Sequence, residues 1–427
     1  MMRNSILFFA FTFFFFSCAT KKAPEEKKKI SVDSSAIIFN EINGAQKKQE
    51  LDTFFQHRFV DGRFSGCVLV AERGVVLYKN SFGWADHEKR DSLQITSSFQ
   101  LASVSKQFTA AAIMLLHQEG KLEYTDTVGK FIPGFYYHGI TIKQLLTHRA
   151  GLDKYTNVCD NYYRQRGCEP GEFNNDSAIE IMKMLRVAPF RKPDLKFDYS
   201  NTGYAILADV VEKISGEPFC EFMQNNFFTP LNMQHTWINT DRKDHPGKTK
   251  AYCRNWSWWQ DNYLDGVSGD KGVFSSVEDM YTWDQALRNG AILKPEILKE
   301  AYTGYSPELD KKKYWNYGFG WRIISFDDGA KAVFHNGWWH GFTSAFYRGL
   351  SDDVTVIILC NKQNMGIYNM QPILGILGAH ILPVVDDEGG NESDSVPPKN
   401  EPAKKCKVAV KKTKSAPAKS SKTKRKK

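Results

Sequence analysis

Strand-like runs at both ends of the apolar part of this chain constrain its fold more than any other feature. In residues 65–83, two apolar runs are separated by Glu72-Arg73-Gly74, a typical hairpin signal. The sequence between the two ends is mixed and largely helical. Four further short β-rich runs occupy residues 317–326, 331–337, 342–350 and 353–362. This order predicts an α+β fold in which the first and last strands share one antiparallel sheet.

The N-terminal residues indicate export. Arg3 precedes an apolar run from Ile6 to Phe16 that is too short to span a bilayer comfortably. Residues 1–18 resemble a bacterial lipoprotein signal peptide, in which Cys18 is lipidated and becomes the mature N-terminus. The alternative is a plain secretory signal with an incidental Cys18. We therefore predict an exported protein, lipid-anchored in the bacterial cell envelope at the periplasm or outer membrane.

The positive charge is concentrated at the C-terminal end. The chain has 427 residues and a formal net charge of +9. From Lys399 onward there are thirteen Lys or Arg residues and one acid, Glu401, so a tail of +12 leaves a body of −3. We predict a polar tether at 19–45, a folded domain at 46–384 and a disordered Lys-rich tail at 385–427. The tail could contact anionic surfaces, but nucleic acid is not an expected partner of an exported protein.

The cysteines predict at most one local disulfide. Cys159 and Cys168 lie nine positions apart in a polar stretch, which makes a disulfide plausible in an oxidising compartment. Cys67 and Cys360 lie in strand-like apolar runs and are expected in the core. No C-x-x-C pair is present, so we expect no structural zinc site and no metal or other cofactor.

A serine and a lysine three residues apart, Ser103 and Lys106, suggest nucleophilic catalysis. They precede an apolar helical run that ends at Gly120. A lysine against apolar surface is easier to deprotonate and can accept a proton from a nearby hydroxyl. The alternative is a solvated lysine in an ordinary helix. The spacing alone is weak evidence, because it recurs at Ser268–Lys271, in a Gly-rich turn, and at Ser421–Lys424, in the tail.

Several ordered motifs resemble the serine β-lactamase and penicillin-binding-protein superfamily, specifically its class C-like branch of serine hydrolases. The resemblance covers roughly Phe59 to Lys362, and the motifs lie in residues 99–133, 140–152, 197–216, 269–283, 317–323 and 334–346. It implies a β-lactamase/transpeptidase-like fold, with an antiparallel sheet flanked by helices and a mostly helical subdomain. The active site is then expected between these two parts, with Ser103 as the nucleophile and Lys106 beside it.

The family's second element is Y-x-N, which occurs four times here. Tyr199–Asn201 fits best, because a Gly-Tyr pair and an apolar helix follow it. The resemblance implies that Tyr199 shuttles a proton from Ser103 to the leaving group, while Asn201 orients Lys106 and binds the substrate. The other three copies begin at Tyr78, Tyr155 and Tyr314.

At the third element this chain departs from the penicillin-processing members. Where they carry K-T-G, it has His335, Asn336 and Gly337, all three expected to bind substrate. The backbone N–H groups of Ser103 and Trp338 are the expected oxyanion hole. A histidine is mostly neutral at pH 7, so we expect weak binding of a substrate carboxylate and poor β-lactam hydrolysis.

The resulting prediction is an exported serine hydrolase that forms an acyl-enzyme on Ser103 and cleaves an ester or amide. A peptidoglycan-type D-amino-acid peptide is one candidate substrate. A true β-lactamase and a non-catalytic envelope binding module are the alternatives. His148 is expected to be structural, and His335 and His340 are expected to point apart and bind no metal. Aromatic side chains near Trp256 and Trp338 suit either a substrate pocket or packing.

Overall fold

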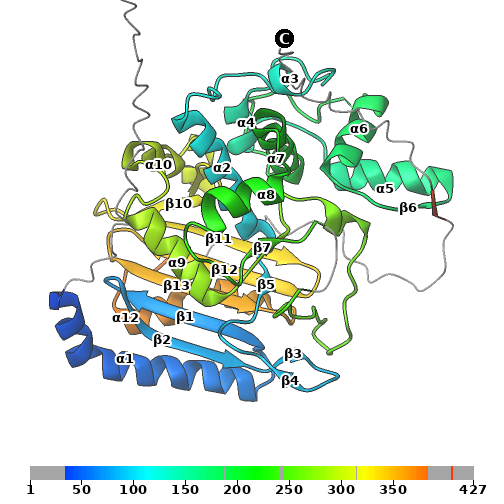
Figure 1. Ribbon diagram of the computed structural model, residues 1–427. Coiled ribbons are helices and arrows are strands. Elements are labelled where there is room, and N and C mark those ends of the chain that lie inside the picture. The colour runs from blue at the N-terminus through cyan, green and yellow to red at the C-terminus, as the bar shows by residue number, and fades with distance from the viewer. Residues whose placement is uncertain (1–33, 187, 241–244, 314, 383–404, 407–427) are drawn as a thin grey trace, which may run out of the picture. The chain divides into compact units, whose positions relative to one another are not determined.

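A seven-stranded antiparallel sheet forms the centre of the fold (Figure 1). Its strand order is β2-β1-β13-β12-β11-β10-β9, so the first hairpin of the chain pairs with the last strand, as predicted. The turn at Arg73 and Gly74 has positive φ at both residues, which suits a tight hairpin. The strands are β1 (Gly66–Glu72), β2 (Val75–Phe82), β9 (Asn316–Tyr317), β10 (Arg322–Ser325), β11 (Lys331–Trp339), β12 (Phe342–Gly349) and β13 (Val354–Cys360).

This computed structural model describes residues 34–186, 188–240, 245–313, 315–382 and 405–406. The predicted signal peptide with Cys18, part of the predicted tether and nearly all of the Lys-rich tail lie outside these residues. Among the residues described, none of the helices is both long and apolar enough to cross a membrane.

Both faces of the sheet are covered, which explains why β1 is buried along its whole length. Its alternate residues contact different cores, as the two-residue period of a strand requires. Val68 and Val70 pack in a core with Leu51 of α1 (Ser34–Val60), whereas Cys67 and Leu69 pack in the core on the opposite face. Helix α12 (Gln371–Leu377) shares the first core. Helix α1 therefore begins inside the predicted tether, at Ser34.

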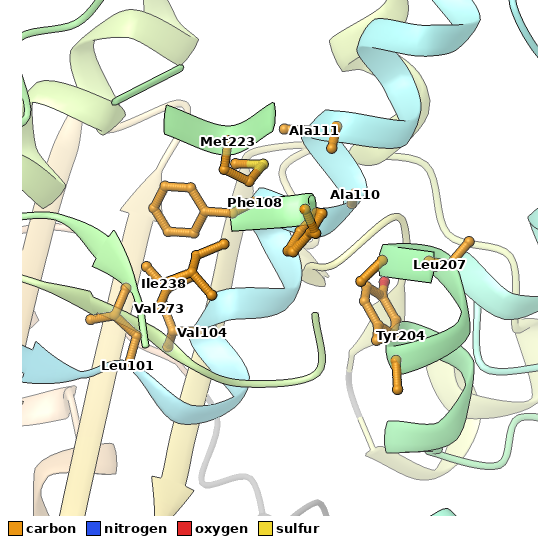
Figure 2. Packing of buried hydrophobic residues seen from close by; sticks show 14 of the residues in the cluster. Leu101, Val104, Phe108, Ala110, Ala111, Tyr204, Leu207, Met223, Ile238 and Val273 are labelled. Carbon is orange, nitrogen blue, oxygen red and sulfur yellow. The ribbon is translucent and has the colours of Figure 1, made fainter. Parts of the chain in front are cut away.

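The second core joins the sheet to the helical part of the fold. Figure 2 shows Phe108 of α2 (Lys106–Gln118) beside Met223, Ile238 and Val273, with α7 (Asn201–Ser215) on the other side of α2. Helices α9 (Val277–Arg288) and α10 (Pro295–Ala301) also cover this face, and α11 spans Pro307–Lys313. The helical part comprises α3 (Val128–Phe131), α4 (Ile142–Leu146), α5 (Tyr155–Arg166), α6 (Asn175–Leu185), α7 and α8 (Phe219–Met223).

Short strands complete the described fold. They are β3 (Trp84–Asp86) with β4 (Asp91–Ser92), β5 (Phe99–Gln100) with β8 (Val273–Ser275) and β7 (Trp237–Ile238), and β6 (Glu169–Pro170) with β14 (Lys405–Cys406). The β6–β14 pairing is parallel and gives two residues of the predicted disordered tail a defined place.

The predicted disulfide between Cys159 and Cys168 is wrong. Cys159 is a buried free thiol on α5, and Cys168 is in a disulfide with a different cysteine. The physical reason is that α5 runs from Tyr155 to Arg166, so Cys159 lies on a helix rather than in a polar loop. Cys67 and Cys360 are buried free thiols, in agreement with their expected place in the core.

Candidate active site

Ser103 lies in a strained turn between a strand and a helix. Strand β5 pairs with β8, and the chain then enters a short 3₁₀ turn, η1 (Ala102–Ser105), that leads directly into α2. Ala102 has φ of 49°, in the left-handed region that non-glycine residues rarely adopt. Such strain is kept where the surrounding structure demands it, and it is frequent at functional sites. Here it precedes the predicted nucleophile.

Lys106 is fully buried, and its hydrogen-bond partners include three oxygen atoms. Its Nζ lies 3.0 Å from Ser103 Oγ, 2.6 Å from Asn201 Oδ1 and 2.8 Å from the Asp270 carbonyl oxygen. The exposed fraction of Lys106 is 0%. The tight 3₁₀ turn brings side chains at i and i+3 onto the same side, so the predicted Ser103–Lys106 contact is present.

These contacts aim the lysine at the serine. The Asn201 Oδ1 and Asp270 carbonyl oxygens can only accept hydrogen bonds, so they take two N–H groups from Lys106. In the neutral amine the remaining position is the lone pair, and it faces Ser103 Oγ. An unprotonated Lys106 is thus oriented to accept the Ser103 proton.

Tyr199 lies beside the lysine. It immediately precedes Ser200, the N-cap of α7, and the same helix carries Asn201 in its first turn. The Lys106 Nζ lies 4.9 Å from the centroid of the Tyr199 ring. The second predicted element therefore stands next to the first, and the proton-shuttle role of Tyr199 stays a prediction.

His148 supports the segment that carries Tyr199. Its Nδ1 accepts a hydrogen bond from Ser200 N–H at 3.1 Å, and its carbonyl oxygen accepts from Asp198 N–H at 2.8 Å. Its ring packs on Tyr199 with centroids 4.3 Å apart. Burial and then the nearby Lys106 charge lower the pKa of His148 well below its usual value. The imidazole is therefore neutral at pH 7 and serves as a scaffold.

Strand β11 approaches Ser103 closely at Gly337. A Cβ added to Gly337 would lie 2.2 Å from the Leu101 carbonyl oxygen and 3.1 Å from Ser103 N. Only glycine fits this approach, and the Gly337 carbonyl accepts a hydrogen bond from Tyr368. The Ser103 backbone thus faces the strand that carries Trp338. This arrangement is compatible with the predicted oxyanion hole, which stays a prediction.

Comparison with known proteins agrees with this geometry. The sequence matches the family described as Beta-lactamase over residues 51–371. The chain belongs to the beta-lactamase family. It is 32% identical over 332 residues to penicillin-binding protein 4* of Bacillus subtilis (strain 168), covering 74% of this chain and 72% of that protein.

Solved structures of this fold include enzymes. EstCE1, described as a hydrolase with promiscuous acyltransferase activity, matches with a TM-score of 0.67 and 22% identity, over 79% of this chain and 100% of that chain. The D-amino acid amidase of Ochrobactrum anthropi SV3 matches with a TM-score of 0.64 and 18% identity, over 78% and 98%. The predicted α+β, β-lactamase-like fold is confirmed, and the chain is a serine hydrolase of the beta-lactamase family.

The third element of the chain is held by hydrogen bonds within the protein. His335 is fully buried, with an exposed fraction of 0%. Its Nδ1 lies 2.7 Å from the Asn336 carbonyl oxygen, which only accepts, so Nδ1 carries the proton. Its Nε2 lies 2.9 Å from the Tyr317 hydroxyl, which therefore donates to it. Both ring nitrogens are thus engaged inside the protein, which disfavours the predicted contact between the His335 side chain and substrate.

Tyr317 is a site residue that the sequence reasoning missed. Burial raises its pKa well above the usual range, so its phenol keeps the proton that it donates to His335. Its ring also packs on His148, with centroids 4.7 Å apart. The signal was present, because Tyr317 opens the Tyr-Gly-Phe-Gly motif, but its contact with His335 requires β9 to pair with β10, which in turn pairs with β11.

Two of the rival motif copies are not part of the described site. Tyr78 and Asn80 hydrogen-bond Asp52 of α1, on the other face of the sheet, and Tyr314 lies outside the described residues. His340 pairs with Asp265 at 3.0 Å, away from His335. In the described part of the chain, no three His, Cys, Asp or Glu side chains gather as metal ligands would.

Proposed function

We propose that this protein is an exported acyl-enzyme hydrolase that cleaves an ester or amide on Ser103. The observation that carries the proposal is the triple hydrogen bonding of the buried Lys106, which aims its lone pair at Ser103 Oγ. A binding module has no chemical reason to keep a desolvated lysine beside a serine. A D-amino-acid peptide of the cell wall is the candidate natural substrate, and the resemblance to a penicillin-binding protein supports it.

The proposed reaction has two halves. Ser103 Oγ attacks the substrate carbonyl carbon and gives its proton to Lys106 Nζ, and the backbone N–H groups of Ser103 and Trp338 hold the developing oxyanion. The carbon–leaving-group bond then breaks as Tyr199 passes a proton to the departing amine or alkoxide. A water molecule attacks the acyl-enzyme by the reverse proton path and releases the acid. No cofactor takes part in the proposed steps.

The third element bears on the leaving group. Both nitrogens of His335 contact Asn336 and Tyr317 inside the protein, which disfavours a contact between this side chain and a substrate carboxylate. We expect esters and amides whose leaving groups are uncharged to react faster than peptides ending in a free carboxylate. A matched pair tests this: a D-alanyl-D-alanine peptide and the same peptide with a C-terminal amide. A faster reaction of the free acid would contradict the expectation.

The proposed location follows from the sequence alone. Residues 1–18 resemble a lipoprotein signal, so we propose a lipid anchor at Cys18 in the cell envelope, with the Lys-rich tail against anionic lipid or wall polymer. Metabolic labelling with a radiolabelled fatty acid, compared between the wild type and Cys18→Ser, tests the anchor. Equal labelling of both would overturn it.

Benzylpenicillin tests the reaction. The mass of the intact protein is followed over time after the drug is added, with Ser103→Ala as the control. A persistent adduct on the wild type alone supports a penicillin-binding protein with slow deacylation. A transient adduct with loss of the drug identifies a β-lactamase. If no adduct forms, simple esters and a fluorophosphonate probe are tested next. If neither reacts, the binding-module alternative is favoured.

A further inference from the structure

Two motif copies that had seemed incidental meet in the folded protein. Lys271, from the second serine–lysine pair, donates a hydrogen bond to the hydroxyl of Tyr155, from the second Y-x-N, at 2.6 Å. Both also contact Asp270: its carboxylate lies 3.2 Å from Lys271 Nζ and 3.1 Å from the Tyr155 hydroxyl. All three side chains are buried, and Lys271 and Asp270 have exposed fractions of 3% and 1%.

Asp270 connects this cluster to the proposed base. Its carbonyl oxygen accepts a hydrogen bond from Lys106 Nζ at 2.8 Å, while its carboxylate holds Lys271. The two buried lysines are therefore linked through the backbone and side chain of one residue. A shift of the Asp270 backbone would therefore alter its contacts with both lysines.

The turn that carries Asp270 has no spare room. Gly269 has φ of 97°, and an added Cβ would lie 2.5 Å from the Tyr204 carbonyl oxygen. Thr109 of α2 donates to the Gly269 carbonyl at 2.7 Å, and Asn175 of α6 donates to the Ser268 carbonyl at 2.8 Å. The turn is thus anchored from both helices, so its geometry depends on the tertiary structure.

Lys271 also contacts the central sheet, at strand β11. Lys271 Nζ lies 4.5 Å from the ring centroid of Trp339, the β11 residue that follows Trp338. Trp339 is held in turn by Asp265, whose carboxylate accepts from its indole N–H at 2.6 Å. Lys271 therefore joins α5, the Asp270 turn and the end of β11, which are the elements that surround the proposed reaction centre.

We propose that Asp270, Lys271 and Tyr155 form a positioning network that aims Lys106 and balances the charge around it. The proposal rests on the proposed role of Lys106 as the base for Ser103. In the proposed reaction, none of these three residues contacts the reacting atoms. Lys271 and Asp270 act through the Asp270 carbonyl and through their opposite charges, and Tyr155 joins them.

The surroundings of Lys106 show why these charges matter. Burial raises the pKa of the Tyr204 phenol and lowers that of the His148 imidazole, so both are uncharged at neutral pH. Asp270 and Lys271 bring opposite charges to the same surroundings. The side chains that face the Lys106 amine from the other elements packed around it include Ser103, Tyr199, Asn201, Tyr204 and His148.

The two charges predict shifts of opposite sign. Lys271→Met removes a like charge that offsets the Asp270 carboxylate, and this change favours the protonated form of Lys106. The acid limb of the Ser103 acylation profile should therefore move up by about one pH unit, with a roughly tenfold lower rate at pH values below the midpoint. Asp270→Asn should move the same limb down. The double variant Asp270→Asn/Lys271→Met restores the balance and should return the midpoint to that of the wild type.

The experiment measures the rate of fluorophosphonate labelling of the full chain from pH 5 to pH 10. Tyr155→Phe keeps both charges and should lower the rate without moving the midpoint. Arg348→Met is the control for a lost buried ion pair, because Arg348 pairs with the buried Asp284 at 2.5 Å instead of with site residues. Shifts of the same sign in both single variants, or an equal shift in Arg348→Met, would overturn the proposal.

A second measurement separates this inference from the proposed function. The ¹³Cε signal of Lys106, assigned as the one that Lys106→Arg lacks, is titrated by NMR in the wild type and in the three charge variants. Opposite shifts of its midpoint in the single variants support the network even when no probe labels Ser103, and in that case the proposed chemistry alone fails. An unmoved midpoint overturns the network even when Ser103 is labelled. Thermal unfolding identifies variants that do not fold. If a single variant does not fold, the midpoint of Lys106 is compared between the wild type and the charge-balanced double variant.

Discussion

Two serine–lysine pairs of this chain, Ser103–Lys106 and Ser268–Lys271, have the same spacing but different contacts: only in the first does the lysine hydrogen-bond the serine. In the first, the 3₁₀ turn into α2 brings the hydroxyl and amine to 3.0 Å. In the second, Ser268 bonds the Asn175 side chain while Lys271 turns to Tyr155 and Asp270. Both lysines are buried, so burial alone does not make a reactive pair. The backbone between the two residues decides which atoms the lysine can reach.

The largest effect is expected from replacing the two serines in parallel. Ser103→Ala removes the nucleophile and should reduce fluorophosphonate labelling by at least about 10³-fold. Ser268→Ala should leave labelling within about twofold, because its hydroxyl contacts Asn175 rather than a lysine. Labelling is quantified by intact mass on the full chain. Equal loss in both variants, or retained labelling of Ser103→Ala, would remove the distinction between the pairs.

The next effect concerns two tightly packed glycines: Gly337, which lies against Ser103, and Gly269, which precedes Asp270 and Lys271. Gly337→Ala places a Cβ 2.2 Å from the Leu101 carbonyl oxygen and should push Ser103 away from β11, lowering the labelling rate about 10²-fold. Gly269→Ala adds a clash at positive φ and should cost about 3 kcal/mol of unfolding free energy, with a smaller loss of rate.

Rates and urea unfolding are measured together for both glycine variants. Gly375→Ala, on α12, is the matched control, because its added Cβ meets no atom within 4 Å. This variant should keep the wild-type rate and lose no stability. A Gly337→Ala variant with wild-type rate and stability would mean that β11 does not confine Ser103.

The smallest effect is the pH dependence of the unfolding free energy that comes from His148, which lies near Lys106 of the first pair. The pKa of His148 is lowered in the folded state, first by burial and then by Lys106, from its ordinary value of 6.5. Below about pH 6.5 the unfolded chain therefore binds a proton that the folded chain does not. The stability contributed by a neutral His148 is complete above that pH and is lost below it, by about 1.4 kcal/mol per pH unit.

Urea unfolding from pH 8 to pH 5 measures this loss. His148→Asn is the control, because asparagine tolerates the positive φ of 54° at this position and keeps an oxygen for Ser200 N–H. The free energy of unfolding of this variant should fall less steeply below pH 6.5. Parallel slopes for the wild type and the variant would show that His148 does not titrate on unfolding.

The local parts of the site were predictable. The i, i+3 spacing of Ser103 and Lys106, the stop at Gly120 and the Asn201 side chain at the start of a helix are short-range patterns, and the structure confirms the Ser103–Lys106 and Lys106–Asn201 contacts. The hairpin and the four late strands were equally readable, since alternation and turn residues are local signals.

The distant contacts were not predictable in the same way. Cys168 seemed placed to pair with Cys159, yet Cys159 lies on a helix and is free. Nothing near His335 indicates that Tyr317, eighteen residues earlier, closes off its Nε2. Lys271 was placed in a Gly-rich turn, and nothing in that turn indicates its partner Tyr155, which lies 116 residues away in the chain.

The sequence by itself determined the family, the strand and helix pattern and the residues that carry the proposed chemistry, because those depend on spacing within a few turns or residues. Only the tertiary structure decided which lysine faces a serine, which histidine is closed off and which carboxylate balances a buried charge. The physical reason is desolvation. The reactivity of a buried polar group is set by the partners that replace water around it, and α5, α7 and β11 bring those partners from distant parts of the chain.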